Sequence, residues 1–247
     1  MNDASDTINQ MSAVTISREY GSGGGEIAAR LARRLGWQLI DHEIVERVAS
    51  EMGTSTQEAE AQDEQTEGVL ARALTSAAYL DPALMVSAPP EAFLSDRQVY
   101  RDTVNRVVKA ATTRGHVVIV GRGSQVILAQ RRDVLHVRII APFEKRVAYV
   151  MQREGLDQHA AQSRIKMKDL DRTRHLEIEY DRKPQEAQLY DFVLNISLLD
   201  LDSAVEVICF MLQQKAKLLS AKTDELGPSV GLSPYPGQPA DFRPTER

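Results

Sequence analysis

The chain has 247 residues, with 30 basic and 35 acidic side chains and a formal net charge of −5. This balance argues against a protein that coats nucleic acid through a broadly basic surface, although it allows a local cationic site. Aromatic residues make up only 5%, which is sparse for a protein that stacks bases on aromatic platforms. The one cysteine, Cys209, excludes an internal disulfide and a cysteine-based zinc cluster, so no metal site is predicted from such residues.

The chain also carries no pattern that addresses it to a membrane. Its apolar runs fall far short of the ~20 residues that a membrane-spanning helix needs. The first residues contain neither a basic region nor an apolar stretch of the kind found in signal peptides. We therefore expect a cytoplasmic protein that binds neither membranes nor nucleic acid.

Short apolar segments alternate with stretches of helical periodicity along the chain. The predicted strands are 13–17, 37–40, 116–120, 135–140 and 192–196. The predicted helices are 27–35, 44–52, 68–80, 92–114, one beginning near Pro142, 157–180 and 201–219. Strands that alternate with helices favour a mostly parallel sheet with helices on both faces. The fold class is therefore α/β, a three-layer α/β/α fold with a parallel sheet of about five strands, a helical insertion and a lid.

The composition divides the chain into one domain with two ends of different character. We expect a flexible N-terminus at 1–12, a folded domain at 13–218 and a disordered tail at 219–247, because five of the ten prolines lie in the last 20 residues. Within the domain, an insertion is expected at about 54–115. Its acidic stretch 54–67 is by default solvated surface, and this stretch or the tail is where a protein partner is expected.

A glycine cluster, Gly21-Ser22-Gly23-Gly24-Gly25, lies between the first predicted strand and its helix. Glycines let backbone N–H groups turn inward, and the N-terminus of the following helix adds a partial positive charge. The cluster therefore predicts a phosphate-binding loop. A merely tight strand-to-helix turn is the competing interpretation.

The glycine cluster can be compared with two known kinds of phosphate-binding loop. A dinucleotide-binding turn needs a third glycine where this chain has Glu26, although Gly21, Gly23 and the later acid Asp41 fit that pattern. The P-loop pattern G-x-x-x-x-G-K-[ST] is absent, and no lysine lies between residues 16 and 32. The loop alone does not decide between them.

A resemblance extends over about residues 13–215. It is carried, in chain order, by 17–28 (SREYGSGGGEIA), 39–47 (LIDHEIVER), 118–123 (VIVGRG), 136–142 (HVRIIAP), 171–174 (DRTR) and 190–195 (YDFVLN). These segments resemble the cytidylate kinase-like family, relatives of the bacterial cytidylate kinases among the P-loop nucleoside monophosphate kinases. The resemblance implies a P-loop kinase-like fold that binds ATP and Mg²⁺ and has small-molecule nucleotides as its partners.

The resemblance also implies roles for particular residues. Gly21, Ser22, Gly23, Gly24 and Gly25 are similar to the loop that holds the ATP phosphates. Asp41 and Arg47 match positions beside the acceptor nucleotide, and Arg122 matches an arginine that contacts the acceptor phosphate. Asp171 and Arg174 match lid positions, where an acid helps to hold CMP and arginines meet the transferring phosphoryl group. The basic residues of 164–174, with Arg172 and Arg174, favour a lid over a solvated helix face once the loop is considered.

The chain departs from that family pattern at its loop and after its third predicted strand. Gly24 stands where the P-loop lysine belongs, and Gly25 where a following residue often supplies a hydroxyl to Mg²⁺. Val120 and Gly123 replace two acids. Arg18 is the cation nearest to the glycines, and we hypothesise that it substitutes for the missing lysine.

The expected function is transfer of a phosphoryl group from ATP to a nucleoside monophosphate, CMP or dCMP before others. The alternative is a nucleotide-binding regulatory or sensing module that has lost catalysis. A dinucleotide-binding oxidoreductase is a distant third.

Overall fold

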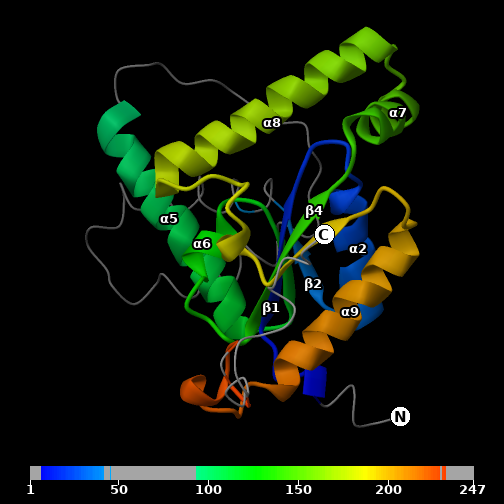
Figure 1. The fold of residues 1–247 in the computed structure, drawn as a ribbon. Helices are drawn as coiled ribbons and strands as arrows, with labels where there is room; N and C mark the ends of the chain where they lie inside the picture. The colour runs from blue at the N-terminus through cyan, green and yellow to red at the C-terminus, as the bar shows by residue number, and fades with distance from the viewer. Residues whose placement is uncertain (1–6, 42–44, 46–92, 229, 232–247) are drawn as a thin grey trace, which may run out of the picture.

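The computed structural model describes residues 7–41, 45, 93–228 and 230–231 (Figure 1). The predicted helices at 44–52 and 68–80 and the acidic stretch 54–67 lie outside the described residues, apart from Val45. Most of the expected insertion and most of the expected tail lie outside them too. Among the described helices, none is both long and apolar enough to cross a lipid bilayer.

The sheet has five parallel strands in the order β2-β3-β1-β4-β5. They are β1 (Ala13–Arg18), β2 (Gln38–Ile40), β3 (Val117–Val120), β4 (Val134–Ile140) and β5 (Phe192–Asn195). Each matches a predicted strand to within about two residues at either end, so the α/β fold with a parallel five-stranded sheet is confirmed. β1 and β3 are buried along nearly their whole length, as expected for strands that are covered on both faces.

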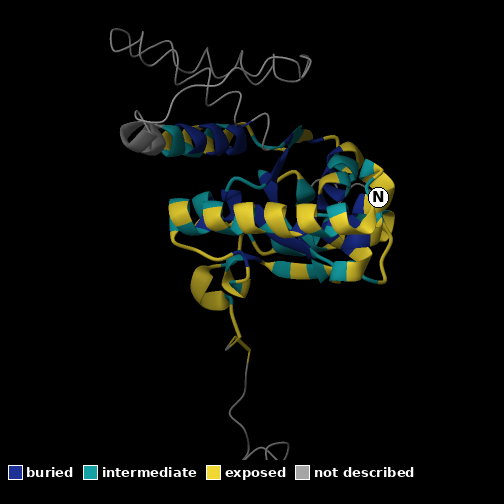
Figure 2. Cartoon of the chain, turned by 90° about the horizontal axis from the view of Figure 1, so that it is seen from above, coloured by how far each residue is buried: buried dark blue, intermediate teal, exposed yellow. Residues whose placement is uncertain are grey.

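Helices cover both faces of this sheet (Figures 1 and 2). α2 (Gly24–Leu35) and α9 (Leu201–Lys217) pack on one face against apolar residues of β1, β3 and β4. α5 (Phe93–Arg114) and the short α6 (Ser124–Ile127) lie on the other face. The three-layer arrangement follows from strands whose side chains alternate between the two faces.

Two further helices lie across the carboxyl edge of the sheet. α7 (Phe143–Glu154) follows β4, and α8 (Gln158–Tyr180) crosses above the strands in Figure 1. They hold each other through a small apolar cluster that includes Val147, Val150 and Ile165. α8 corresponds to the segment predicted at 157–180, and Asp157 caps its first turn by accepting a hydrogen bond from the Ala160 N–H.

Helix α2 begins earlier than the glycine cluster suggested. Gly23 is its N-cap in the left-handed conformation (φ 71°), and Gly24 and Gly25 form the first turn instead of lying outside the helix. The N–H groups of these two glycines need no hydrogen-bond partner within the helix, because the first turn of any α-helix lacks preceding carbonyl groups to accept them. The helix ends at Gly36, as predicted, with φ 68° and its N–H directed to the Ala32 and Arg33 carbonyls.

A buried histidine makes the stability of this fold sensitive to acid. His136 on β4 shares a 2.8 Å hydrogen bond with the hydroxyl of Thr15, and burial lowers the pKa of its imidazole from 6.5 to about 4. The folded protein therefore favours the neutral ring. The neutral ring therefore contributes to the free energy of unfolding above pH 6.5. This contribution, up to about 3 kcal/mol, is lost as the pH falls from 6.5 toward 4.

We therefore expect His136→Gln to reduce the fall in Tm between pH 6.5 and pH 4, measured by circular dichroism. His159→Gln, at an exposed position of α8, is the control and should keep the wild-type pH dependence. An identical pH dependence in the wild type and the His136 variant would contradict this account.

Candidate functional site

A cavity of about 640 Å³ lies at the carboxyl edge of the sheet, beneath α8. In open α/β sheets this edge is where ligands bind. The lining comes from the ends of β1 and β3, from β4, from α8 and from the chain after it. The lining residues are Ser17, Arg18, Glu19, Tyr20, Gly121, Arg122, Gly123, Gln125, Arg138, Lys168, Asp169, Asp171, Arg172, Thr173, His175, Leu176, Pro184 and Gln185.

Three arginines proposed from the sequence meet in this cavity. Arg18 ends β1, Arg122 follows β3 and Arg172 reaches in from α8. Burial lowers the pKa of Arg122 and of Arg172. For Arg18, burial together with the positive charges of Arg172 and Arg122 lowers the pKa to about 9, although the guanidinium stays protonated at neutral pH. Buried cations that repel one another form a site that favours a polyanion.

The stem of Arg18 lies directly against Gly24. A Cβ atom on Gly24 would lie 2.6 Å from the Arg18 Cβ and 3.1 Å from its Cγ, while a Cβ on Gly121 would meet the Arg18 guanidinium. The side chain therefore runs from the first turn of α2 toward the end of β3. It fills the space that a side chain at position 24 would need.

Arg122 stands in a constrained turn. Its φ is 56°, and its neighbours Gly121 and Gly123 have φ values of 81° and 65°. The ring of Tyr180, the last residue of α8, occupies the place where a Gly123 side chain would be, and its hydroxyl lies 3.4 Å from the Arg122 carbonyl oxygen. Glycine is required at 123 by both conformation and contact, so the end of α8 holds the turn that carries Arg122.

The middle of α8 is attached to the segment between β1 and α2. The Asp169 carboxylate accepts a 2.7 Å hydrogen bond from the Tyr20 N–H and forms a 2.5 Å ion pair with Arg146 of α7. Arg172 donates to the Arg18 carbonyl oxygen at 3.3 Å and lies 5.2 Å from the centre of the Tyr20 ring. These contacts place Arg172 next to Arg18.

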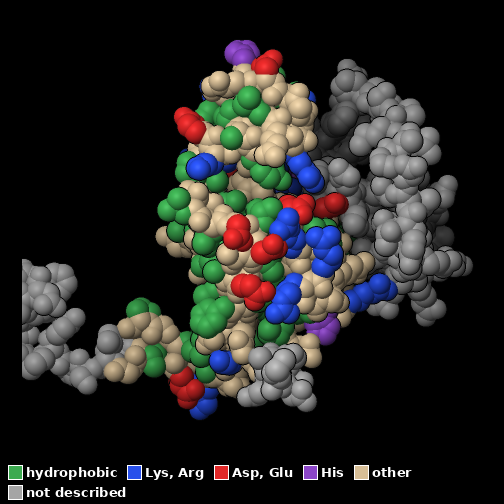
Figure 3. Space-filling model, turned by 90° about the vertical axis from the view of Figure 1, so that its right-hand side faces the viewer, with side chains coloured by type: hydrophobic (Ala, Val, Ile, Leu, Met, Phe, Trp, Pro, Cys, Tyr) green, Lys and Arg blue, Asp and Glu red, His purple; other side chains and the backbone are tan. Residues whose placement is uncertain are grey.

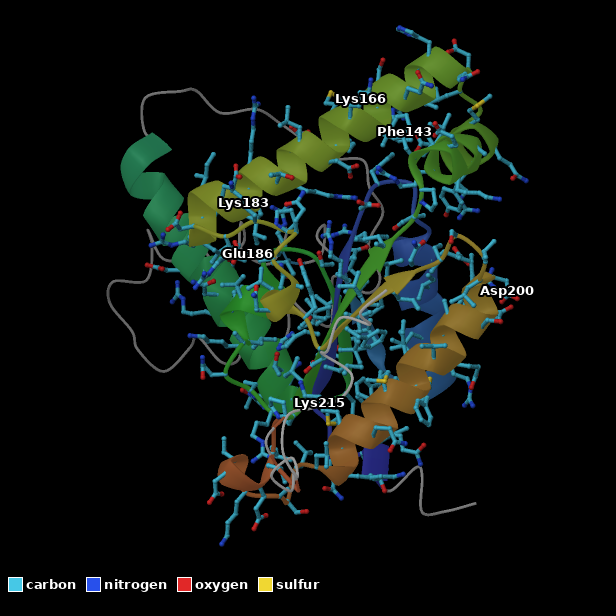
Figure 4. All side chains as sticks on the ribbon, in the orientation of Figure 1. Phe143, Lys166, Lys183, Glu186, Asp200 and Lys215 are labelled. Carbon is cyan, nitrogen blue, oxygen red and sulfur yellow. The ribbon has the colours of Figure 1, made fainter. Side chains whose placement is uncertain are left out.

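The joint between α7 and α8 carries further cationic contacts. Phe143, at the start of α7, has Lys166 of α8 6.0 Å from its ring centre (Figure 4). The Tyr20 hydroxyl donates a 2.6 Å hydrogen bond to Glu154, which also pairs with Arg164 at 2.5 Å. Two of the five basic residues in 164–174 thus contribute to attaching α8 instead of facing the cavity.

Not every residue proposed from the sequence lines the cavity. Arg174 is exposed on α8 and is not among the lining residues. Asp171 is also exposed, but it does line the cavity. Asp41 directly follows β2 and is close enough to raise the pKa of Arg18, without being among the lining residues. Arg47 lies outside the described residues.

The glycine cluster borders the cavity without lining it. A Cβ on Gly21 would lie 2.9 Å from the Arg146 carbonyl oxygen, and one on Gly23 would lie 2.9 Å from Leu201. Tight packing against α7 and α9 therefore accounts for part of the glycine requirement. Gly25 differs, because no heavy atom of the described residues outside its own helical turn lies within 4 Å of a Cβ there.

The sequence reasoning missed one cation of the cavity, Arg138, and included a second, Lys168, only as a member of the basic run 164–174. Lys168 is exposed on α8, whereas Arg138 is buried in a strand whose other residues are apolar apart from His136. A charged residue inside the run Leu135–Ile140 was a signal that could have been used, since buried strands rarely carry one without a partner or a ligand.

The described side chains do not fit a magnesium site of the usual P-loop kind. Position 25 offers no hydroxyl, the Ser22 hydroxyl donates to the Glu19 carbonyl oxygen at 2.9 Å, and Glu26 pairs with Arg30 at 3.1 Å. Within the described part of the chain, no group of three or more His, Cys, Asp or Glu residues is placed to hold a metal ion.

Outside the cavity, opposite charges lie together. Arg30 pairs with Asp202 at 2.8 Å and Arg34 with Glu206 at 3.1 Å, which links α2 to α9. Figure 3 likewise shows basic and acidic side chains interspersed on one face of the molecule. The concentration of cations in the cavity is thus not a general property of this surface.

Comparisons with known proteins agree with this architecture. A cytidylate kinase from Ignicoccus hospitalis is 25% identical over 203 residues, which are 82% of this chain and 99% of that relative. A uronate isomerase from Corynebacterium glutamicum is 26% identical over 114 residues, 46% of this chain, and the match spans only 22% of the isomerase. The solved structure of an uncharacterized protein from Eubacterium ventriosum shares the fold, with a TM-score of 0.59, 21% identity, and coverage of 81% of this chain and 98% of that one.

A comparison with protein families identifies the family of the chain. The model of the cytidylate kinase-like family matches residues 13–198. This range begins at β1, ends after β5 and includes every described residue that lines the cavity. The chain belongs to the cytidylate kinase-like family.

Proposed function

We propose that this protein transfers a phosphoryl group from ATP to a nucleoside monophosphate, with CMP or dCMP as the preferred acceptor. The observation that carries the proposal is the meeting of Arg18, Arg122 and Arg172 in one cavity at the carboxyl edge of the sheet. Membership of the cytidylate kinase-like family supports it.

Phosphoryl transfer needs little covalent chemistry from a protein. It needs two substrates held in line and positive charge around the migrating group. An arginine suits this purpose because its planar guanidinium contacts two phosphate oxygens at once. The cavity offers such groups in a partly buried setting, where charge interactions are less screened than in water.

In this proposal Arg18 takes the place of the P-loop lysine. The stem of its side chain lies where a side chain at Gly24 would begin. Its guanidinium therefore comes from the N-terminal end of the loop, whereas the P-loop lysine comes from the C-terminal end. The N–H groups of residues 21–25 bind the ATP phosphates at the start of α2.

The remaining proposed residues divide between the acceptor and the transferring group. Arg122, Asp41 and Arg47 hold the acceptor, and Asp171 helps to orient it. Arg172 stabilises the transferring phosphoryl group. Arg174 is assigned the same role through a movement of α8, because its present position is exposed.

The test is ADP release in a coupled assay with ATP and CMP, dCMP, UMP or AMP in turn. We expect turnover with CMP or dCMP to exceed turnover with the other acceptors. Calorimetry of ATP binding to the same preparation is the control for a competent site. ATP binding without turnover of any acceptor would overturn the kinase proposal.

ATP binding without turnover is the result expected for the second candidate, a nucleotide-binding regulatory module that has lost catalysis. The specific observation in its favour is the bare first turn of α2, where Gly24 and Gly25 supply neither a lysine nor a hydroxyl.

The dinucleotide-binding alternative loses support from the strand order, because β3 separates β2, with Asp41 at its end, from β1. In the dinucleotide-binding fold those two strands are neighbours.

A further inference from the structure

Two buried arginines near the cavity differ in whether acidic side chains lie beside them. Arg138 on β4 is 7% exposed and Arg146 on α7 is 8% exposed. Arg146 forms ion pairs with Asp169 at 2.5 Å and Glu19 at 3.5 Å. Among the described residues, no carboxylate oxygen lies within ion-pair distance of the Arg138 guanidinium.

The contacts of Arg138 are to neutral groups. Its Nη1 donates a 3.1 Å hydrogen bond to the Ser17 hydroxyl, and its guanidinium carbon lies 5.8 Å from the centre of the Tyr190 ring. The Tyr190 hydroxyl is in turn 3.2 Å from the same Ser17 oxygen and 3.0 Å from the Pro184 carbonyl oxygen. These contacts fix the side chain in place without neutralising its charge.

A fixed, buried and uncompensated charge destabilises a protein unless something else supplies the opposite charge. Arg138 and Ser17 both line the cavity, so an anion entering it would reach them. Arg172 lies close enough to Arg138 and to Arg18 to interact electrostatically with both. The group of cations that includes Arg18 and Arg172 therefore extends to the buried Arg138, on the floor of the cavity.

We infer that Arg138 and Ser17 form a phosphate subsite at the floor of the cavity, which binds a phosphate group of the acceptor or of ATP. The guanidinium binds two phosphate oxygens, and the anion supplies the charge that the folded chain lacks there. The identity of the ligand as a nucleotide rests on the proposed function, whereas the subsite itself does not.

The first measurement compares the stability of two variants without ligand. Arg138→Met removes an unpaired charge and keeps most of the side-chain volume, so we expect Tm to rise by about 2–4 °C. Arg146→Met removes the ion pairs that Arg146 forms with Asp169 and Glu19, so we expect Tm to fall. A fall in Tm of equal size for both variants would contradict the claim that Arg138 is uncompensated.

The second measurement is isothermal titration calorimetry with inorganic phosphate, CMP and ATP as separate probes. We expect Arg138→Met to weaken phosphate binding, and the binding of either CMP or ATP, at least tenfold. The nucleotide that is affected identifies the source of the phosphate group. Arg132→Met, which removes an exposed arginine at the opposite edge of the sheet, should bind all three probes as the wild type does.

Arg138→Lys provides a readout should the methionine variant fail to fold. It keeps the charge but loses the two-oxygen contact, so we expect weaker phosphate binding with little change in Tm. Affinities within twofold of wild type for all three probes, in either variant, would overturn the subsite. Arg138-dependent phosphate binding without turnover of any acceptor would overturn the kinase proposal and leave the subsite standing.

Discussion

Arg18→Ala is expected to lower kcat/KM for phosphoryl transfer by about 10³-fold or more, the size of effect seen when a positioned arginine is removed from such a site. The side chain is held between Gly24 and Gly121, and it lies next to Arg122 and Arg172. Its loss leaves the loop without a cation at the place where the P-loop lysine would act. The coupled ADP-release assay measures the effect.

The control for this prediction is Arg33→Ala, which removes an exposed cation from the last turn of the same helix. It should leave turnover within about twofold of wild type, as is usual for exposed surface positions. Arg18→Lys should recover part of the lost activity, because it restores charge without the planar fork. Unchanged ATP affinity and turnover in Arg18→Ala would show that Arg18 does not replace the lysine.

The second large effect is a contrast between two adjacent glycines. Gly24→Ala places a methyl group 2.6 Å from the Arg18 Cβ and 3.5 Å from the Ile139 Cβ. We expect it to destabilise the fold by about 1–3 kcal/mol, as overpacking does, and to lower turnover at least about tenfold by displacing Arg18.

Gly25→Ala is the matched variant, one residue further along the first turn of α2. Among the described residues outside its own helical turn, none has a heavy atom within 4 Å of a Cβ at this position, and its φ is not positive. The methyl group therefore meets no obstacle from them. Replacing glycine by alanine in a helix is then stabilising, by about 0.5–1 kcal/mol. Urea unfolding measures both variants, and a change of the same sign and size in each would contradict the assigned packing at Gly24.

The strands and most helix ends were predictable from the sequence because they depend on local patterns. The run that became β3 is apolar throughout, as a buried parallel strand requires, and those that became β1 and β4 are mostly apolar. Gly36 ends α2 as its position indicated. The start of α2 was less predictable. Whether Gly24 and Gly25 join the helix depends on their neighbours in space, not on their own weak propensity.

Within the candidate site, the sequence identified the right kind of residue more reliably than the right residue. Arg172 lines the cavity and Arg174 does not, because two positions along a helix differ by about 200° in direction. Arg138 was missed because its role depends on the pairing of β4 with β1, which places it opposite Ser17. That register is a long-range contact and leaves no local pattern.

The amino-acid sequence by itself determined the α/β class, the positions of the five strands, the glycine cluster and the resemblance to the cytidylate kinase-like family. These depend on hydrophobic periodicity and on the order of short motifs along the chain. Only the tertiary structure decided the strand order, the packing of Arg18 on Gly24 and the group of arginines that share the cavity. The physical reason is that charge compensation depends on distance and burial. The net charge of −5 is a sum over the whole chain, whereas the cavity collects cations whose opposite charge the described residues do not supply in full.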